Sequence, residues 1–325
     1  MNRRAFITLL GGAAAWPLVA RAQWPSRKAS IGVLHPGQAS NVNTRIMAFR
    51  EGLSENEARR EVNLELIIRL ADGDLTRLPV LAMDLVSSRV DAILAAGPPA
   101  LQAARGATKV IPVIAVDLES DPVGSGFVET LARPGGNVTG VFLDFPDFSA
   151  KCLEILTESV PALAKIAVLW DPTTGALQLD AIAAAAKRLG VGTQVFEARR
   201  VADIADAFYA IDRPRIQGAV ILSSPLFGGN PQLTADLALK RNIPTISLLP
   251  EFAREGGLLG YGPDIQGLFR QAGGMARKVL HGATPAEIPA ERPSRFQLVA
   301  NLRTARQLGV ELPSSILARA DEVIE

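Results

Sequence analysis

The 325-residue sequence predicts an α/β protein of two similar lobes, each a parallel sheet with helices on both faces. Two observations indicate this fold class. Short apolar runs rich in β-branched residues alternate with segments of helical spacing, and the alternation restarts after Pro146. In addition, 48% of the residues are hydrophobic and few are aromatic, so the chain can bury a large aliphatic core.

The first half contains repeated strand–helix–strand units. Expected strands lie at 31–34, 64–69, 92–95, 110–116 and 138–143, and expected helices at 44–53, 78–86 and 99–107. Because a helix that joins two strands returns the chain to the same end of the sheet, these strands should run parallel.

The second half repeats this pattern. Its expected strands lie at 166–170, 192–197, 219–222, 245–248 and 258–261, and its expected helices at 147–160, 176–189, 204–211 and 232–241.

No Gly/Ser-rich or Pro-rich tether separates the halves. The strand at 138–143, the segment Gly260-Tyr261-Gly262 and the extended run 296–299 are instead three candidate crossings between the lobes. Three crossings make each lobe discontinuous. The expected N-terminal lobe comprises 30–142 and 263–294, and the expected C-terminal lobe comprises 143–262 and 300–325.

The first 22 residues have the pattern of a signal peptide of the twin-arginine type. Arg3 and Arg4 precede an apolar run at 7–20, and Ala20-Arg21-Ala22 is a small-x-small cleavage site. The alternative is a single membrane anchor, but the run is shorter than the roughly 20 residues that span a bilayer. We therefore expect cleavage near Ala22 and a periplasmic mature protein.

Charge and motifs exclude several kinds of partner. The formal net charge of +1 gives no electrostatic basis for binding nucleic acid or an anionic membrane. The single cysteine, Cys152, cannot form an internal disulfide, and we expect it to be buried. His35 and His281 belong to no metal motif, and no nucleophile elbow or phosphate-binding loop is present. We expect a monomer that binds a small molecule, with no cofactor, metal or catalysis.

Several motifs resemble one family of binding proteins, the periplasmic substrate-binding proteins of ABC transporters related to tryptophan- and tyrosine-type binders. The motifs that carry the resemblance are Asp121-Pro122-Val123-Gly124, the run 131–140, Glu251-Phe252, Gly256-Gly257-Leu258 and Tyr261-Gly262. The resemblance covers essentially the whole mature chain. It implies a type I periplasmic-binding fold, whose two doubly wound lobes close on one ligand, and a membrane ABC permease as partner.

The candidate ligand-binding residues follow the carboxyl ends of the expected strands, where ligands bind in open parallel sheets. They are Gln38, Ser40, Asn41, Gly97, Pro98, Asp117, Asp121, Asp144, Asp171, Ser223, Phe227, Glu251 and Tyr261. Ser40 and Asn41 either help to receive a carboxylate or cap a helix, and Asp121 and Asp171 either hold a cation or act as helix caps.

Glu251 is the residue that we expect to hold a ligand ammonium group. Arginines, which a phosphate or sulfate ligand would require, are missing from these strand-end loops. Six aromatic residues near strand ends are candidates to clamp an apolar side chain: Phe142, Phe145, Trp170, Phe227, Phe252 and Tyr261.

We therefore expect an exported solute-binding protein that delivers its ligand to an ABC permease. The expected ligand is an amino acid with a branched or aromatic side chain, followed by an aromatic carboxylate. The alternatives are a ligand-binding subunit of a sensory receptor system and an α/β-fold hydrolase that uses paired acids.

Overall fold

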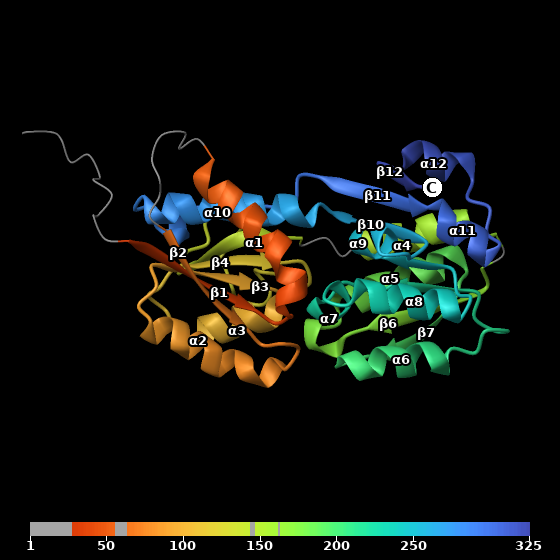
Figure 1. Ribbon diagram of the computed structural model, residues 1–325, viewed down its shortest axis with the longest axis horizontal. Coiled ribbons are helices and arrows are strands. Elements are labelled where there is room, and N and C mark those ends of the chain that lie inside the picture. Colours follow the sequence, from red (N-terminus) through yellow and green to blue (C-terminus); the bar gives the residue numbers. More distant parts are fainter. Residues whose placement is uncertain (1–27, 56–63, 144–146, 162) are drawn as a thin grey trace, which may run out of the picture.

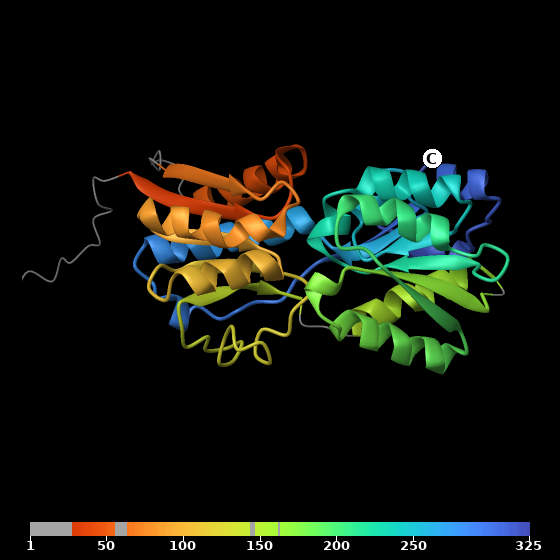
Figure 2. The same cartoon turned by 90° about the horizontal axis from the view of Figure 1, so that it is seen from below.

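The computed structural model describes residues 28–55, 64–143, 147–161 and 163–325. The expected signal peptide and two candidate residues, Asp144 and Phe145, lie outside the described residues. Two lobes lie side by side along the long axis of the molecule, and the view turned by 90° shows the same separation (Figures 1 and 2). Among the described residues, no helix is long and apolar enough to cross a membrane.

The first lobe is built on a five-stranded sheet of order β2-β1-β3-β4-β5, in which all neighbours are parallel. The strands are β1 (Ala29–His35), β2 (Leu64–Leu70), β3 (Ala92–Ala96), β4 (Val113–Asp117) and β5 (Val138–Phe142). Helices α1 (Ala39–Ser54) and α10 (Ile265–Leu280) cover one face, and α2 (Leu78–Ser87) and α3 (Pro98–Ala107) cover the other. Short 3₁₀ turns lie at Leu75–Arg77 and Pro285–Glu287.

The second lobe is built on a seven-stranded sheet of order β12-β11-β10-β9-β8-β6-β7. Its strands are β6 (Lys165–Trp170), β7 (Gly192–Glu197), β8 (Gly218–Ile221), β9 (Thr245–Ser247), β10 (Leu259–Pro263), β11 (Phe296–Asn301) and β12 (Glu322–Ile324). All neighbouring pairs are parallel except β10 and β11. The expectation of a wholly parallel sheet is wrong at this pair, because the chain re-enters the second lobe from the opposite end.

Helices also cover both faces of the second sheet. Helices α4 (Asp147–Ser159), α5 (Leu177–Leu189), α11 (Leu302–Leu308) and α12 (Ser314–Arg319) contribute to one core, and α6 (Val201–Ala210) and α8 (Pro231–Lys240) contribute to the other. The short helices α7 (Pro225–Gly228) and α9 (Glu251–Arg254) follow β8 and β9, and a 3₁₀ turn at Pro172–Thr174 follows β6. The fold is the predicted pair of doubly wound α/β lobes.

The chain crosses between the two sheets three times: from β5 to α4, from β10 to α10, and back into β11. Each crossing contributes one aromatic ring to a cluster at the second lobe. The ring centroid of Phe148 lies 5.1 Å from that of Tyr261 and 5.2 Å from that of Phe296. The three crossings are therefore joined by aromatic packing where they meet the second lobe, while the expected lobe boundaries stay a prediction.

Two glycines allow α1 and α10 to pack backbone against backbone. A Cβ atom on Gly273 would overlap the carbonyl oxygen of Phe49, and one on Gly52 would overlap the carbonyl oxygen of Arg270. This close packing brings Arg45 of α1 to Phe269 of α10, with 6.0 Å between the guanidinium carbon and the ring centroid. The helix pair thereby positions two residues of the site described below.

We predict that Gly273→Ala destabilises the protein by about 1–3 kcal/mol, because the added methyl group forces the two helices apart. Gly274→Ala is the matched control, since a Cβ atom there would meet nothing within 4 Å. It should leave stability unchanged or raise it by up to about 1 kcal/mol, the helix-propensity difference between the residues. Urea unfolding of both variants measures this, and equal effects would contradict the packing role of Gly273.

Candidate functional site

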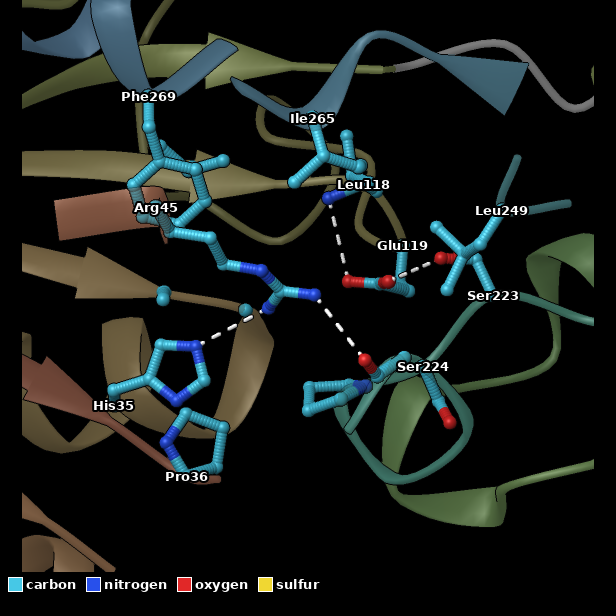
Figure 3. A pocket seen from close by; sticks show the side chains of 15 residues that line it. His35, Pro36, Arg45, Leu118, Glu119, Ser223, Ser224, Leu249, Ile265 and Phe269 are labelled. Atoms are coloured by element: carbon cyan, nitrogen blue, oxygen red, sulfur yellow. Dashed lines mark hydrogen bonds between the residues drawn. The ribbon is translucent and has the colours of Figure 1, made fainter. Parts of the chain in front are cut away.

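A cavity of about 50 Å³ lies between the two lobes, at the carboxyl ends of the strands (Figure 3). We call it the main cavity. His35 ends β1, Glu119 follows β4, and Ser223 follows β8, so both lobes contribute to it. Its apolar wall is formed by Leu118, Leu249, Ile265 and Phe269.

The main cavity contains the guanidinium group of Arg45, whose side chain extends from the second turn of α1. Its Nη2 donates a hydrogen bond to the carbonyl oxygen of Gly228 at 3.2 Å, and this bond joins the first lobe to the second. Burial lowers the pKa of the guanidinium, and the carboxylates of Glu251 and Glu119 counteract that effect. Because arginine remains protonated in proteins, the cavity contains a buried positive charge.

Glu119 forms the second hydrogen bond across the cavity. The Ser223 hydroxyl donates to its Oε1 at 2.6 Å, and the Leu118 N–H donates to its Oε2 at 3.3 Å. Burial, followed by the neighbouring carboxylate of Asp117, raises the pKa of Glu119 to about 8. The carboxyl group is therefore protonated at neutral pH unless a cation approaches it.

His35 is buried beside Arg45. Its Nδ1 accepts the backbone N–H of Gly37 at 2.9 Å, and its Nε2 lies 3.3 Å from Arg45 Nη1. Burial, followed by the charge of Arg45, lowers the pKa of His35 to about 3. The imidazole ring is thus neutral at physiological pH.

Gly97 allows the lobes to approach each other beside the cavity. Its φ is +78°, and a Cβ atom there would lie 2.8 Å from Pro225 Cγ of the second lobe. Pro225 also lines a second cavity of about 40 Å³, which we call the outer cavity. Its polar lining comprises Gln38, Asp171, Thr173, Arg199 and Asn230.

Several predicted site residues lie in or beside the two cavities. Gly97 and Ser223 line the main cavity, and Gln38 and Asp171 line the outer cavity. Asp171 also accepts the N–H and hydroxyl of Thr173, so the helix-cap alternative holds for it as well. Pro98 is the first residue of α3, immediately after Gly97.

Asp117 and Glu251 are acidic residues close to the main cavity without lining it. Asp117 is buried at the end of β4, where its Oδ1 accepts the N–H groups of Glu119 and Ser120. Glu251 begins α9, and its Oε1 lies 3.8 Å from Arg254. Asp117 Oδ2 and Glu251 Oε2 are buried without a hydrogen-bond partner among the described residues. Burial raises the pKa of both carboxyl groups.

Three other predicted residues, Asp121, Phe227 and Tyr261, lie away from both cavities. The Asp121 carboxylate accepts the N–H groups of Val123 and Gly124 in a local turn. Phe227 is buried in a core of the second lobe, and Tyr261 belongs to the aromatic cluster at the crossings. Ser40 and Asn41 lie in the first turn of α1, after its N-cap Gln38, which makes no side-chain cap hydrogen bond.

Arg45, Glu119 and Phe269 line the main cavity but are not among the candidate ligand-binding residues predicted from the sequence. No arginine lies in the loops that contain the candidate residues. Arg199 lines the outer cavity from the loop after β7, and Arg45 reaches the main cavity from a helix. A signal was available, because Arg45 lies on the same helix face as the buried residues Val42, Ile46 and Phe49. Of the six aromatic candidates, Phe142 and Phe252 are core residues, whereas Phe269, which was not a candidate, lines the main cavity.

Comparison with known proteins places the chain in a family. Residues 30–324 match the family described as ABC transporter substrate binding protein, and the chain therefore belongs to it. This is a family of solute-binding proteins and not of enzymes. The described residues include no cluster of His, Cys, Asp and Glu that could hold a metal ion.

The relatives include proteins with aromatic amino-acid ligands. A tyrosine-binding protein of Clostridioides difficile is 25% identical over 289 residues, which are 88% of this chain and 82% of the relative. An ABC domain from Streptococcus pneumonia in complex with L-Trp has a TM-score of 0.83 at 25% identity, over 92% of this chain and 100% of that one. A conserved domain protein from Vibrio cholerae also has a TM-score of 0.83, at 24% identity over 91% of this chain and 100% of that one.

We predict that the closed arrangement weakens as the pH rises toward 8. Glu119 is buried and protonated when the lobes are together, whereas an exposed glutamate ionises near its ordinary pKa of 4.5. Closure thus takes up a proton, so its stabilisation is complete below about pH 4.5 and is lost as the pH rises through about 8, at up to about 1.4 kcal/mol per pH unit. Small-angle scattering should show a radius of gyration that increases over this range.

The control is Glu119→Gln, which keeps the shape of the neutral side chain and cannot ionise. Its radius should depend much less on pH, with a residual response from Asp117 and Asp171, whose pKa values burial also raises. A radius in the native protein that is constant from pH 5 to 9, or that decreases, would contradict this account.

Proposed function

We propose that this protein is exported to the periplasm, binds an amino acid with an aromatic side chain between its lobes, and delivers it to a membrane ABC permease. The observation that carries the proposal is that the Arg45 guanidinium and the Glu119 carboxyl group line one cavity between the lobes. A zwitterionic amino acid supplies both matching charges in a single small molecule.

The energetics of burial favour such a ligand. A buried charge is costly unless it is paired and hydrogen-bonded. A ligand ammonium group beside Glu119 favours ionisation of this carboxyl group, and Glu251 adds a second carboxylate within the electrostatic range of Arg45. An aromatic carboxylate lacks the ammonium group and should bind less tightly.

The apolar wall supports an aromatic or branched side chain. Phe269 and the aliphatic residues Leu118, Leu249 and Ile265 can enclose a ring or a branched chain. The ligands of two relatives, tyrosine and L-Trp, support the choice of an aromatic side chain.

The size of the main cavity supports a hinge mechanism. At about 50 Å³, it is too small to admit an aromatic amino acid without movement. The lobes must separate to admit the ligand and then close on it, and the permease would recognise the closed form. Bending in the three crossings would allow this movement.

The direct test is calorimetric titration with L-tryptophan, L-tyrosine and L-phenylalanine, alongside L-leucine, L-valine and indole-3-acetate. We expect the aromatic amino acids to bind most tightly and to reduce the radius of gyration in small-angle scattering. Absence of binding to every amino acid would overturn the proposal. Binding with no decrease in radius at saturation would overturn hinge closure.

Two variants distinguish the carboxylates in this titration. Glu119→Gln should weaken amino-acid binding by about ten- to a hundredfold, because a charge-assisted hydrogen bond to the ammonium group contributes roughly 1.5–3 kcal/mol. Glu251→Gln should have a smaller effect, since Glu251 does not line the main cavity. A larger loss in Glu251→Gln would instead identify Glu251 as the ammonium-binding residue.

The proposed export route has its own test. Replacing Arg3 and Arg4 by lysine should block processing and periplasmic accumulation, because the twin-arginine signal is read by a receptor. Cell fractionation and the mass of the protein measure this. Normal processing of the double variant would indicate the general secretory route instead.

A further inference from the structure

His35 and Arg45 approach each other in the main cavity, and the tautomer of His35 decides which of the two atoms can donate a hydrogen bond. The backbone N–H of Gly37 points at His35 Nδ1 from 2.9 Å, so Nδ1 is the acceptor of this ring. Across the ring, Nε2 lies 3.3 Å from Arg45 Nη1, which carries hydrogen.

A neutral imidazole has one N–H and one acceptor nitrogen. Burial keeps the His35 ring neutral, with a pKa of about 3. Because Nδ1 accepts from Gly37, the hydrogen belongs on Nε2. The Nε2–H group and the Arg45 guanidinium therefore face each other without an acceptor between them, an arrangement that an anionic oxygen would satisfy.

We propose that His35 Nε2–H and the Arg45 guanidinium together form the subsite for the carboxylate group of the ligand. The inference deepens the proposed function and rests on it for the identity of the ligand. Carboxylate oxygens accept several hydrogen bonds and pair well with a guanidinium fork. Gly97, the N-cap of α3, lines the same cavity, so the positive end of that helix dipole adds to the attraction.

The subsite also fixes the orientation of the ligand. With its carboxylate at His35 and Arg45, an amino acid would direct its ammonium group toward Glu119 and Ser223. Arg45 Nη2 donates at the same time to Gly228 of the second lobe. A carboxylate on Arg45 would therefore hold this side chain in the position that bridges the lobes.

The first test is independent of the natural ligand. The chain contains two histidines, so ¹H–¹⁵N spectra of the imidazole rings are simple, and His281→Gln assigns them. We expect the neutral Nε2–H tautomer of His35 from pH 5 to 8. Formate, which is small enough for the cavity, should shift the Nε2–H resonance in a saturable way. The Nδ1–H tautomer or an imidazolium ring would overturn the proposal.

Two variants control the formate titration. Arg45→Met should abolish the saturable shift, whereas Arg50→Met, the same change at an exposed arginine of α1, should retain it. Melting temperatures check that both variants fold. Arg45→Lys keeps the charge without the guanidinium fork and should give an intermediate response. A shift that persists unchanged in folded Arg45→Met or Arg45→Lys would contradict the subsite.

The second test compares L-tryptophan with L-tryptophanamide, which keeps the ammonium group and lacks the carboxylate. The native protein should bind the amide about ten- to a hundredfold more weakly, and Arg45→Met should bind the two within about threefold of each other. Equal binding in the native protein would overturn the subsite and leave the proposed function intact. If the native protein binds neither compound, the proposed aromatic ligand is wrong, and the tautomer and formate measurements still decide the subsite.

Discussion

Burial of a guanidinium and a carboxyl group, those of Arg45 and Glu119, between the two lobes is the constraint on which the site depends. Arg45 and Glu119 are both removed from water, and each makes one hydrogen bond that crosses from the first lobe to the second. Burying a charged group without a partner costs free energy, and this cost falls when a complementary charge of the ligand binds beside it. In the proposed hinge mechanism, ligand choice and lobe closure are therefore coupled, because a molecule with both charges would compensate both groups only when the lobes are together.

The fold brings these charges together through backbone packing. The parallel strands of both sheets direct their carboxyl ends toward the space between the lobes, which places His35, Glu119 and Ser223 there. The glycine contacts between α1 and α10 bring Arg45 and Phe269 into the same cavity. The site thus depends on features distant in sequence, and a defect in helix packing would alter ligand binding without touching the ligand.

The alternation of apolar runs and helical segments was sufficient to predict the two α/β lobes, and the strand-end rule placed Gly97, Ser223 and Asp171 at the cavities. It could not predict Arg45, because a long side chain reaches the cavity from within a helix. The sequence also could not distinguish the roles of two neighbouring acidic residues. The Asp117 carboxylate accepts a backbone N–H group, whereas Glu119, two residues later, lines the main cavity. Periodicity also carries no strand direction, so the antiparallel β10–β11 pair was missed.

The central claim is that the main cavity holds a zwitterionic amino acid between the Arg45 guanidinium and the Glu119 carboxyl group. A crystal structure of the protein grown with L-tryptophan tests it most directly. We predict electron density for the ligand between the lobes, with the carboxylate within hydrogen-bond distance of His35 Nε2 and Arg45 and the ammonium group beside Glu119. A ligand bound outside the cleft, or one whose carboxylate lies away from Arg45, would contradict the account.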